Sequence, residues 1–405
     1  MRDADDPALF RRVFTRSVAL LSRRWGLHRL AEVEDAVQAA LMTAVERWPR
    51  DGRPENPAAW VATVAHRRLV DAHRRQAAVV PNDVEPPLQP LSSGVLGREI
   101  GDEVLRMMFV CCDPAIPIES QLVFTLKVLS GFSVGEVAAH LFVSTDNVYK
   151  RLSRARDVLK SRRGLLDLGP EQYPRRLDAV VLVIYLVFTE GHLASAGDEA
   201  IRVELCREAL RLGGLLAEHP VGRQPKVAAL MALMHLHASR LGSRFDGVGE
   251  LVTLEEQDRS RWDRSHRAAG LRWLAMSAEG GTLSRYHAEA GIAAAHAMAP
   301  TFAETDWERI AACYALLERV APSPWHRLNR ALAVAELRGP EEGLALLADL
   351  TPAPQVTGSG AWAAALADLH RRAEHPASFV AYRRAALDRA PTDAVRRLLE
   401  RRFDA

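Results

Sequence analysis

Apolar residues recur at intervals of three and four positions along almost the whole chain of 405 residues, interrupted by short groups that contain Pro or Gly. This spacing places apolar side chains on one side of an α-helix, whereas a half-buried strand needs alternation at every second position. The composition is 48% hydrophobic but only 6% aromatic, which also favours helices over sheets. The sequence therefore predicts an all-α protein.

The length and the distribution of charge indicate more than one domain. A chain of 405 residues exceeds what one hydrophobic core usually serves, so two or three domains are expected. The formal net charge is only +2, but basic residues outnumber acidic ones within residues 1–165 and do not in the remainder. A surface for nucleic acid is therefore expected in the N-terminal part.

The cysteines and the apolar runs point to a cytoplasmic protein. Cys111, Cys112, Cys206 and Cys313 show no CxxC spacing, so neither a zinc site nor a disulfide framework is indicated. No secretory signal is apparent, and the most apolar stretch, Ala179–Phe188, is too short to cross a bilayer. We expect this stretch to be a buried helix, and we expect no metal and no cofactor.

A run rich in Pro and Ser, Ala77–Gly97, has no hydrophobic period and predicts an extended linker. Pro57, behind the possible N-cap Asn56, suits a first helical turn. Helical periods precede the linker at 9–25, 32–48 and 57–76, and follow it at 102–112, 119–130, 134–142 and 145–163.

A second boundary is expected near Gly164–Pro174, and helix-length periods alternate with Pro or Gly breaks from there to the C-terminus. Three of these periods open at Pro225, Pro324 and Pro391. Their separations lie close to multiples of about 33–34 residues, the length of a tetratricopeptide-type helix pair. The pattern suggests degenerate helical repeats.

Residues 132–160 have the pattern of a helix-turn-helix. Ser133 and Glu136 form a capping box that opens the first helix, and Ser144 can cap the second, in which Val148 and Leu152 face inward. Polar residues and then cations remain for DNA, which is the order expected along a recognition helix. A solvated basic helix face is the alternative.

Two further helices have one-sided charge. Residues 59–76 carry paired arginines about two turns apart, which suits a phosphate backbone. Trp60 could stack on an unpaired base, although by itself core packing is the better interpretation. In residues 32–48, Glu34, Asp35 and Gln38 lie opposite an apolar face. That helix is either an ordinary surface helix or a docking face for a basic partner.

In this order, these stretches resemble the extracytoplasmic-function sigma factors. Residues 32–48 are similar to the region 2 helix that binds the clamp helices of the RNA polymerase β′ subunit, with Glu34, Asp35 and Gln38 matching. Residues 57–76 are similar to the part that melts and reads the −10 element. The residues implied there are Trp60, Arg67, Arg68, Asp71, Arg74 and Arg75, with Arg68 standing where Asn is commoner.

Residues 119–160 resemble region 4, which reads the −35 element. The resemblance implies DNA contacts from Thr145, Asn147, Lys150, Arg151, Arg154 and Arg156. Two departures leave the base preference open: Phe142 occupies a turn position that is often Gly, and Tyr149-Lys150 replace the residues usual there.

The chain continues past the sigma core, and residues 178–350 are similar to the subgroup with a tetratricopeptide-like C-terminal extension. The resemblance implies region 2 at 1–76, a linker at 77–100, region 4 at 101–165 and the extension at 175–405. It also implies a sigma factor that is not an enzyme and is nucleoid-associated when bound to polymerase. Its partners would be promoter DNA and core RNA polymerase, through the β′ clamp helices and the β flap, with no membrane.

Two motifs in the extension invite a catalytic interpretation. In residues 257–264, Asp258 and Asp263 stand among arginines, but a salt-bridged helix start explains them better. Glu190 and His192 lack an oxyanion motif, which favours a loop joining two buried helices. A hydrolase remains a weaker alternative.

The stronger alternative is a tetratricopeptide-type scaffold with a helix-turn-helix that regulates transcription without the polymerase clamp. A stack of helix pairs also provides a concave surface. Under the sigma interpretation, we expect the extension to pack on the sigma core and regulate it in cis.

Overall fold

The computed structural model describes residues 7–79, 102–161, 168–195, 199–279 and 281–404. Within these ranges the regular elements are helices, and the extended pairing consists of a single isolated bridge between Phe245 and Leu251. The predicted all-α class is confirmed. The predicted linker falls almost wholly outside the described residues.

Contacts divide the chain into two compact units. The first comprises residues 1–138, 144–183 and 219–221, and the second comprises residues 139–143, 184–218 and 222–405. Helix α8 contributes its first half to the first unit and its second half to the second.

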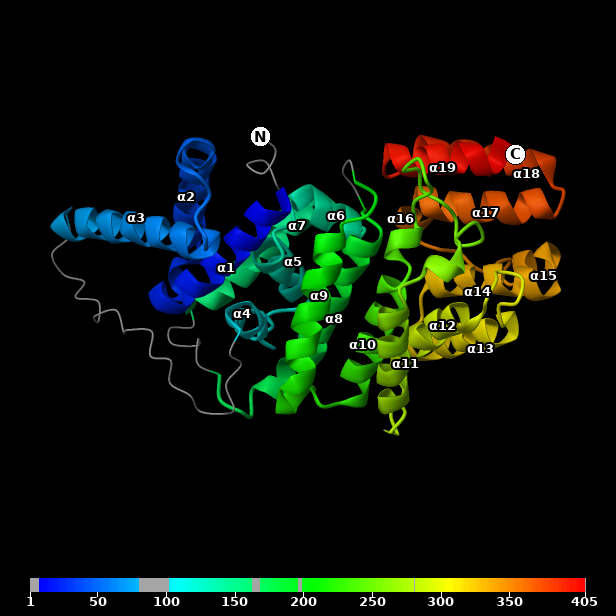
Figure 1. Cartoon of the computed structure of the whole chain (residues 1–405), viewed down its shortest axis with the longest axis horizontal. Coiled ribbons are helices and arrows are strands. Elements are labelled where there is room, and N and C mark those ends of the chain that lie inside the picture. Colours follow the sequence, from blue (N-terminus) through cyan, green and yellow to red (C-terminus); the bar gives the residue numbers. More distant parts are fainter. Residues whose placement is uncertain (1–6, 80–101, 162–167, 196–198, 280, 405) are drawn as a thin grey trace. The chain divides into compact units, whose positions relative to one another are not determined.

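The first unit contains the helices that the sequence places before and just after the linker (Figure 1). They are α1 (Pro7–Trp25), η1 (Leu27–Arg29), α2 (Leu30–Asp51), α3 (Pro57–Val79), α4 (Glu103–Cys111), α5 (Ile118–Leu129), α6 (Val134–His140, of which 134–138 lie in this unit), α7 (Thr145–Ser161) and the start of α8 (Tyr173–His192).

The second unit continues with short helices connected by turns and by a longer segment at 244–258, coloured from green to red in Figure 1. They are α9 (Val203–Glu218), α10 (Pro225–Ala238), η3 (Leu241–Ser243), η4 (Arg259–Arg261), α11 (Arg264–Ser277), α12 (Arg285–Met298), α13 (Trp307–Val320), α14 (Pro324–Arg338), α15 (Pro340–Ala345), α16 (Pro354–Thr357), α17 (Gly360–Arg372), α18 (Pro376–Asp388) and α19 (Asp393–Asp404). The turn η2 (Pro220–Gly222) lies between α9 and α10.

Local capping chemistry explains where several helices begin. The side chain of Asn56 accepts a hydrogen bond from the Ala59 backbone N–H at 3.1 Å, as expected for the N-cap of α3. Pro225 and Pro324 open α10 and α14. The third predicted start differs slightly, since α19 begins at Asp393, after Thr392 rather than at Pro391.

The first unit is held by a buried ion pair as well as by apolar packing. Arg176, in the first turns of α8, donates to the Asp113 carboxylate at 2.8 Å and to the backbone oxygens of Phe109 and Val110. Both charged side chains are less than 5% exposed. This contact fixes the start of α8 against the segment that follows α4.

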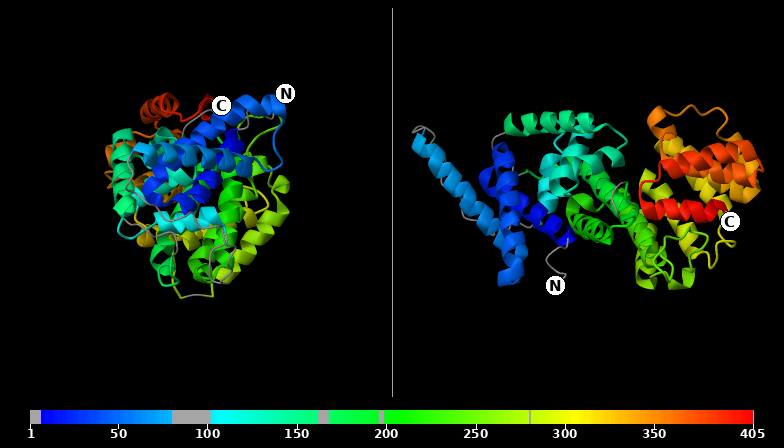
Figure 2. Two further views of the ribbon diagram at one scale, coloured as in Figure 1. Left: turned by 90° about the vertical axis from the view of Figure 1, so that its left-hand side faces the viewer. Right: turned by 90° about the horizontal axis from the view of Figure 1, so that it is seen from above.

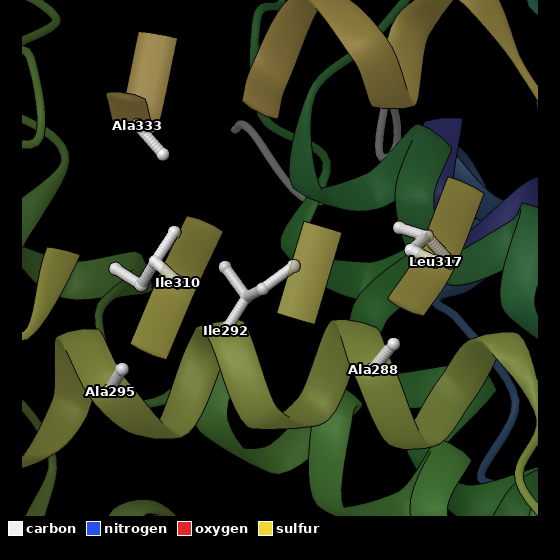
Figure 3. Packing of buried hydrophobic residues seen from close by; sticks show 6 residues of the cluster. All are labelled: Ala288, Ile292, Ala295, Ile310, Leu317 and Ala333. Atoms are coloured by element: carbon white, nitrogen blue, oxygen red, sulfur yellow. The ribbon is translucent and has the colours of Figure 1, made fainter. Parts of the chain in front are cut away.

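Small side chains allow the helices of the second unit to approach closely. Ala288, Ile292 and Ala295 of α12 face Ile310 and Leu317 of α13 and Ala333 of α14 (Figure 3). A second apolar cluster joins α17, α18 and α19, which appear in orange and red in both views of Figure 2. Gly270 likewise allows α11 to approach α10 closely, because a Cβ there would lie 2.6 Å from the Leu236 side chain.

Ala179–Phe188 lies in α8, and Val180, Val183 and Ile184 of that helix are fully buried. The prediction of a buried helix is therefore confirmed. None of the helices in the described part of the chain has the length and apolar character needed to cross a membrane.

Candidate polymerase and nucleic-acid interface

Helix α2 presents the predicted polymerase-binding residues in two different environments. Asp35 and Gln38 are exposed, whereas Glu34 is only 7% exposed. Glu34 follows Leu30 by four positions and precedes Val37 by three, so it lies on the buried stripe of the helix. The expectation that Glu34 lies opposite the apolar face is therefore wrong for this residue, although its spacing from Leu30 and Val37 was visible in the sequence.

Glu34 is neutralised from within the first unit. Its carboxylate accepts a hydrogen bond from Arg156 Nη2 at 2.9 Å. Burial raises the pKa of Glu34, and the nearby guanidinium of Arg156 partly opposes that shift. A predicted polymerase contact and a predicted −35 contact are therefore paired with each other in this structure.

Helix α3 displays an exposed basic face. Arg67, Arg68, Arg74 and Arg75 are all exposed, as is Asp71. Arg75 Nε donates a hydrogen bond to the backbone oxygen of Asp71 at 3.2 Å. The guanidinium groups thus lie along one side of the helix, where Arg68 also donates to Thr43 Oγ1 at 3.1 Å.

Trp60 lies at the opposite end of α3 and is half-buried. Its ring meets the ring of Trp48 edge to face, with centroids 5.7 Å apart. The structure therefore gives Trp60 a packing role and leaves part of its ring accessible.

The local geometry of α6 and α7 follows the predicted caps. The Ser133 N–H donates to Glu136 Oε2 at 2.6 Å, and the Glu136 N–H donates to Ser133 Oγ at 3.1 Å. Ser144 Oγ accepts from the Asn147 N–H at 3.3 Å. The sequence therefore predicted both helix starts correctly.

Phe142 lies in the turn between α6 and α7 with a φ of +52°. This left-handed region is strained for a residue with a Cβ, at roughly 1–2 kcal/mol. The need for this conformation explains why a glycine suits that turn position better.

Helix α7 buries Val148 and Leu152, as predicted, and exposes the polar residues of its first turns. Thr145, Asn147, Lys150 and Arg154 are exposed, whereas Arg151 and Arg156 are half-buried. By helical spacing, Asn147, Lys150 and Arg154 fall on one side of the helix.

The motif at 257–264 has a structural role. Asp258 accepts from the Ser260 N–H at the start of η4, and Asp263 accepts from the His266 N–H at the start of α11. Arg259 is buried and donates to the backbone oxygens of His296 and Ala299. The aspartates are thus helix caps, and Arg259 binds carbonyl groups at the end of α12.

The motif around Glu190 does not form a catalytic triad. Ser195 Oγ lies 2.5 Å from Glu190 Oε2 and 3.0 Å from His140 Nδ1, and Glu190 Oε2 approaches the same Nδ1 at 2.8 Å. A triad needs the serine and the carboxylate on different ring nitrogens. In addition, Glu190 is fully buried and faces Arg202 at 3.6 Å. The expected loop starts only after His192, since Glu190 and His192 lie in α8.

His235, His237, His287 and His296 do not form a metal centre. Within the described ranges, no group of three or more His, Cys, Asp or Glu side chains is arranged to hold a metal ion.

Comparison with known proteins finds two families that match segments of this chain. Sigma-70 region 2 matches residues 9–79, which hold α1, α2 and α3. A family of unknown function (DUF6596) matches residues 176–278. The chain is 38% identical over 327 residues to an uncharacterized protein of Rhizobium meliloti (strain 1021), covering 78% of this chain and 77% of that protein. No solved structure matches.

The name of the Rhizobium protein assigns no activity. The functional assignment of this chain therefore depends on the region 2 match and on the helices that carry it. The chain belongs to the same family as the Rhizobium protein, and its match to region 2 supports a sigma factor of the sigma-70 family.

Proposed function

We propose that this chain is a sigma factor of the extracytoplasmic-function group that directs core RNA polymerase to specific promoters. The observation that carries the proposal is the exposed basic face of α3 within the segment that matches region 2. Polymerase supplies the chemistry of RNA synthesis, and this chain supplies the contacts to core enzyme and promoter.

In this proposal α2 docks on the β′ clamp helices. Asp35 and Gln38 are exposed and can meet a basic partner helix directly. Glu34 can take part only after its pair with Arg156 separates. The initial contact would therefore come from the two exposed residues.

Helix α3 would hold the separated strand at the −10 element. Arg67, Arg68, Arg74 and Arg75 form a cationic track for the phosphate backbone. The accessible part of the Trp60 ring could stack on a base, while its contact with Trp48 fixes the ring in place.

Helix α7 would enter the major groove at the −35 element. Thr145 and Asn147 stand in its first turn, where base edges are read, and Lys150 and Arg154 follow at positions suited to phosphates. Arg156 is occupied by Glu34 in this structure. DNA binding through Arg156 therefore requires the same pair to open.

Promoter-dependent transcription with purified core polymerase tests the proposal, on promoters identified from the sites bound in cells. Arg67→Ala and Arg154→Ala should each reduce transcription, and the slope of log affinity against log salt should fall by about one for each lost phosphate contact. Arg16→Ala is the matched control, because Arg16 is an exposed arginine of α1 outside both surfaces. Wild-type transcription from both variants would count against the assignment.

We further propose that the C-terminal extension, a tetratricopeptide-like array of helices, regulates the sigma core in cis. Support comes from the composition of the second unit, which includes residues 139–143, the end of α6 and the start of the turn that leads to α7. In that unit His140 Nδ1 lies 2.8 Å from Glu190 of α8. Through this contact the extension would act on the segment that precedes the predicted recognition helix.

The full chain with His140→Gln tests regulation in cis without removing a domain. Truncation at residue 175 would be a poor test, because it would remove the buried Arg176 from the first unit. If the extension acts through this turn, His140→Gln should alter promoter-dependent transcription at equal amounts of folded protein. Unchanged transcription would remove the idea, with exposed His28→Gln as the control.

A further inference from the structure

Four basic side chains gather in the second unit from segments far apart in the sequence. His192 ends α8, His237 lies in the last turn of α10, and Arg240 and Arg244 flank η3. The His192 and His237 ring centroids are 4.8 Å apart. All four side chains are half-buried. We call these residues the Arg/His cluster.

The hydrogen bonds within the cluster fix the protonation of its histidines. Arg244 Nη1 lies 3.2 Å from His192 Nδ1, and Arg240 Nη2 lies 3.5 Å from His237 Nδ1. A guanidinium can only donate, so each Nδ1 must accept and each neutral ring carries its proton on Nε2. The polar groups that remain are therefore donors.

Some of these donors have no acceptor. His192 Nε2 and Arg244 Nε are enclosed and lack a hydrogen-bond partner among the described residues. An enclosed donor without an acceptor is unfavourable. Arg244 also donates to the His192 backbone oxygen, which caps the end of α8 and gives Arg244 a structural role as well.

The cluster also lacks negative charge. Burial, together with Arg244 and Arg259, lowers the pKa of Arg240 to about 9, and burial, Arg240 and Arg244 lower the pKa of His192. No carboxylate acts on either guanidinium in the described part of the chain. Glu190, in the same helix as His192, is occupied by Ser195 and Arg202. Two guanidinium charges therefore remain uncompensated.

We propose that the Arg/His cluster is a binding site for the phosphate group of a small molecule. A phosphate dianion offers several acceptor oxygens to donors that converge from different elements, and it neutralises both arginines. A carboxylate would compensate only one of the two charges. All four residues lie within the segment 176–278 that matches the family of unknown function. None of the four is among the residues proposed to contact DNA or polymerase.

Thermal unfolding of the full chain tests the site directly. Inorganic phosphate should raise the unfolding temperature in a saturable manner, beyond the effect of sodium chloride at the same ionic strength. A parallel titration with a nucleoside monophosphate asks whether the phosphate is free or part of a larger molecule, and saturable stabilisation by either supports the site. Equal responses to chloride and to both phosphates would overturn the proposal.

Arg240→Gln is the most informative variant, because within the described ranges the Arg240 side chain donates to the His237 ring and to no backbone oxygen. Its affinity for inorganic phosphate should fall by about tenfold to a hundredfold. Arg207→Gln removes the same charge from an exposed position on α9 and should bind like wild type. Isothermal titration of each folded variant measures the difference.

Equal phosphate affinity for Arg240→Gln and wild type would contradict the site. Should Arg240→Gln fail to fold, Arg240→Lys retains the charge but loses the planar fork. That variant should bind phosphate more weakly than wild type, and unchanged affinity would again contradict the proposal.

Discussion

Two arginines of the first unit and two of the second are compensated in different ways. In the first unit Arg176 meets Asp113 and Arg156 meets Glu34. In the second, Arg240 and Arg244 meet imidazole rings and a backbone oxygen instead of carboxylates. Since a sheltered charge needs compensation, Arg176 and Arg156 are satisfied within the first unit, whereas the Arg/His cluster has a place for an anion. Other arginines of the second unit do meet carboxylates, as Arg202 meets Glu190.

The largest loss of stability is expected from replacing Arg176, whose charge is paired with a buried carboxylate. Arg176→Met leaves Asp113 buried without its cation and should lower the free energy of unfolding by about 3–5 kcal/mol. Denaturant unfolding measures this change. The neighbouring Arg175→Met is the control, because Arg175 is exposed on the same helix and should change stability little. Equal effects from the two substitutions would break the comparison.

A smaller loss is expected when Arg156 is removed. Arg156→Gln should cost about 1–2 kcal/mol at neutral pH, less than Arg176→Met because the Arg156 side chain is 36% exposed. Chemical denaturation at pH 7 measures the difference. A cost as large as that of Arg176→Met would mean that partial exposure does not weaken the pair.

The pH dependence of stability reports on Glu34. Its pKa is raised in the folded chain, so between the unfolded and the folded pKa the folded state binds more protons. Stability from this group is therefore greatest at low pH and falls as pH rises above about 4.5.

Glu34→Gln should abolish the decrease in folding stability that Glu34 causes as pH rises. The variant should therefore gain stability relative to wild type as pH increases from 4 to 7. Unfolding curves across this range measure the effect. Asp35→Asn provides the comparison, because Asp35 is exposed on the same turn of α2. A wild-type pH profile in Glu34→Gln would show that burial of Glu34 has no energetic consequence.

The smallest change in stability is expected from replacing Arg240 in the second unit when no anion is added. Arg240→Met should change the free energy of unfolding by less than about 1 kcal/mol, and the change can be stabilising, because no carboxylate loses its partner. Unfolding in a phosphate-free buffer measures it. A loss comparable to that of Arg176→Met would show that Arg240 is already compensated and would remove the contrast between the units.

Local sequence patterns predicted much of the fold because caps and apolar periods act within a few residues. Asn56, Ser133 and Ser144 form the caps expected of them, and Val148 and Leu152 face inward. The helix that contains Ala179–Phe188 is buried, as its composition indicates.

Pairings between distant residues could not be predicted in the same way. Glu34 and Arg156 are 122 positions apart, and a single sequence carries no signal that joins them. The Arg/His cluster depends likewise on the ends of α8 and α10 meeting around η3. The buried position of Glu34 on its own helix was visible in its spacing from Leu30 and Val37, but the partner that burial requires was not.

Binding to core RNA polymerase tests the central claim most directly. Purified full-length chain should co-elute with core polymerase. Asp35→Lys should abolish this, because it reverses an exposed charge on the face of α2 proposed to meet the clamp. Asp51→Lys should bind like wild type, since it makes the same reversal at an exposed position on the opposite side of α2. No co-elution of the wild-type chain, or equal binding by Asp35→Lys, would contradict the account.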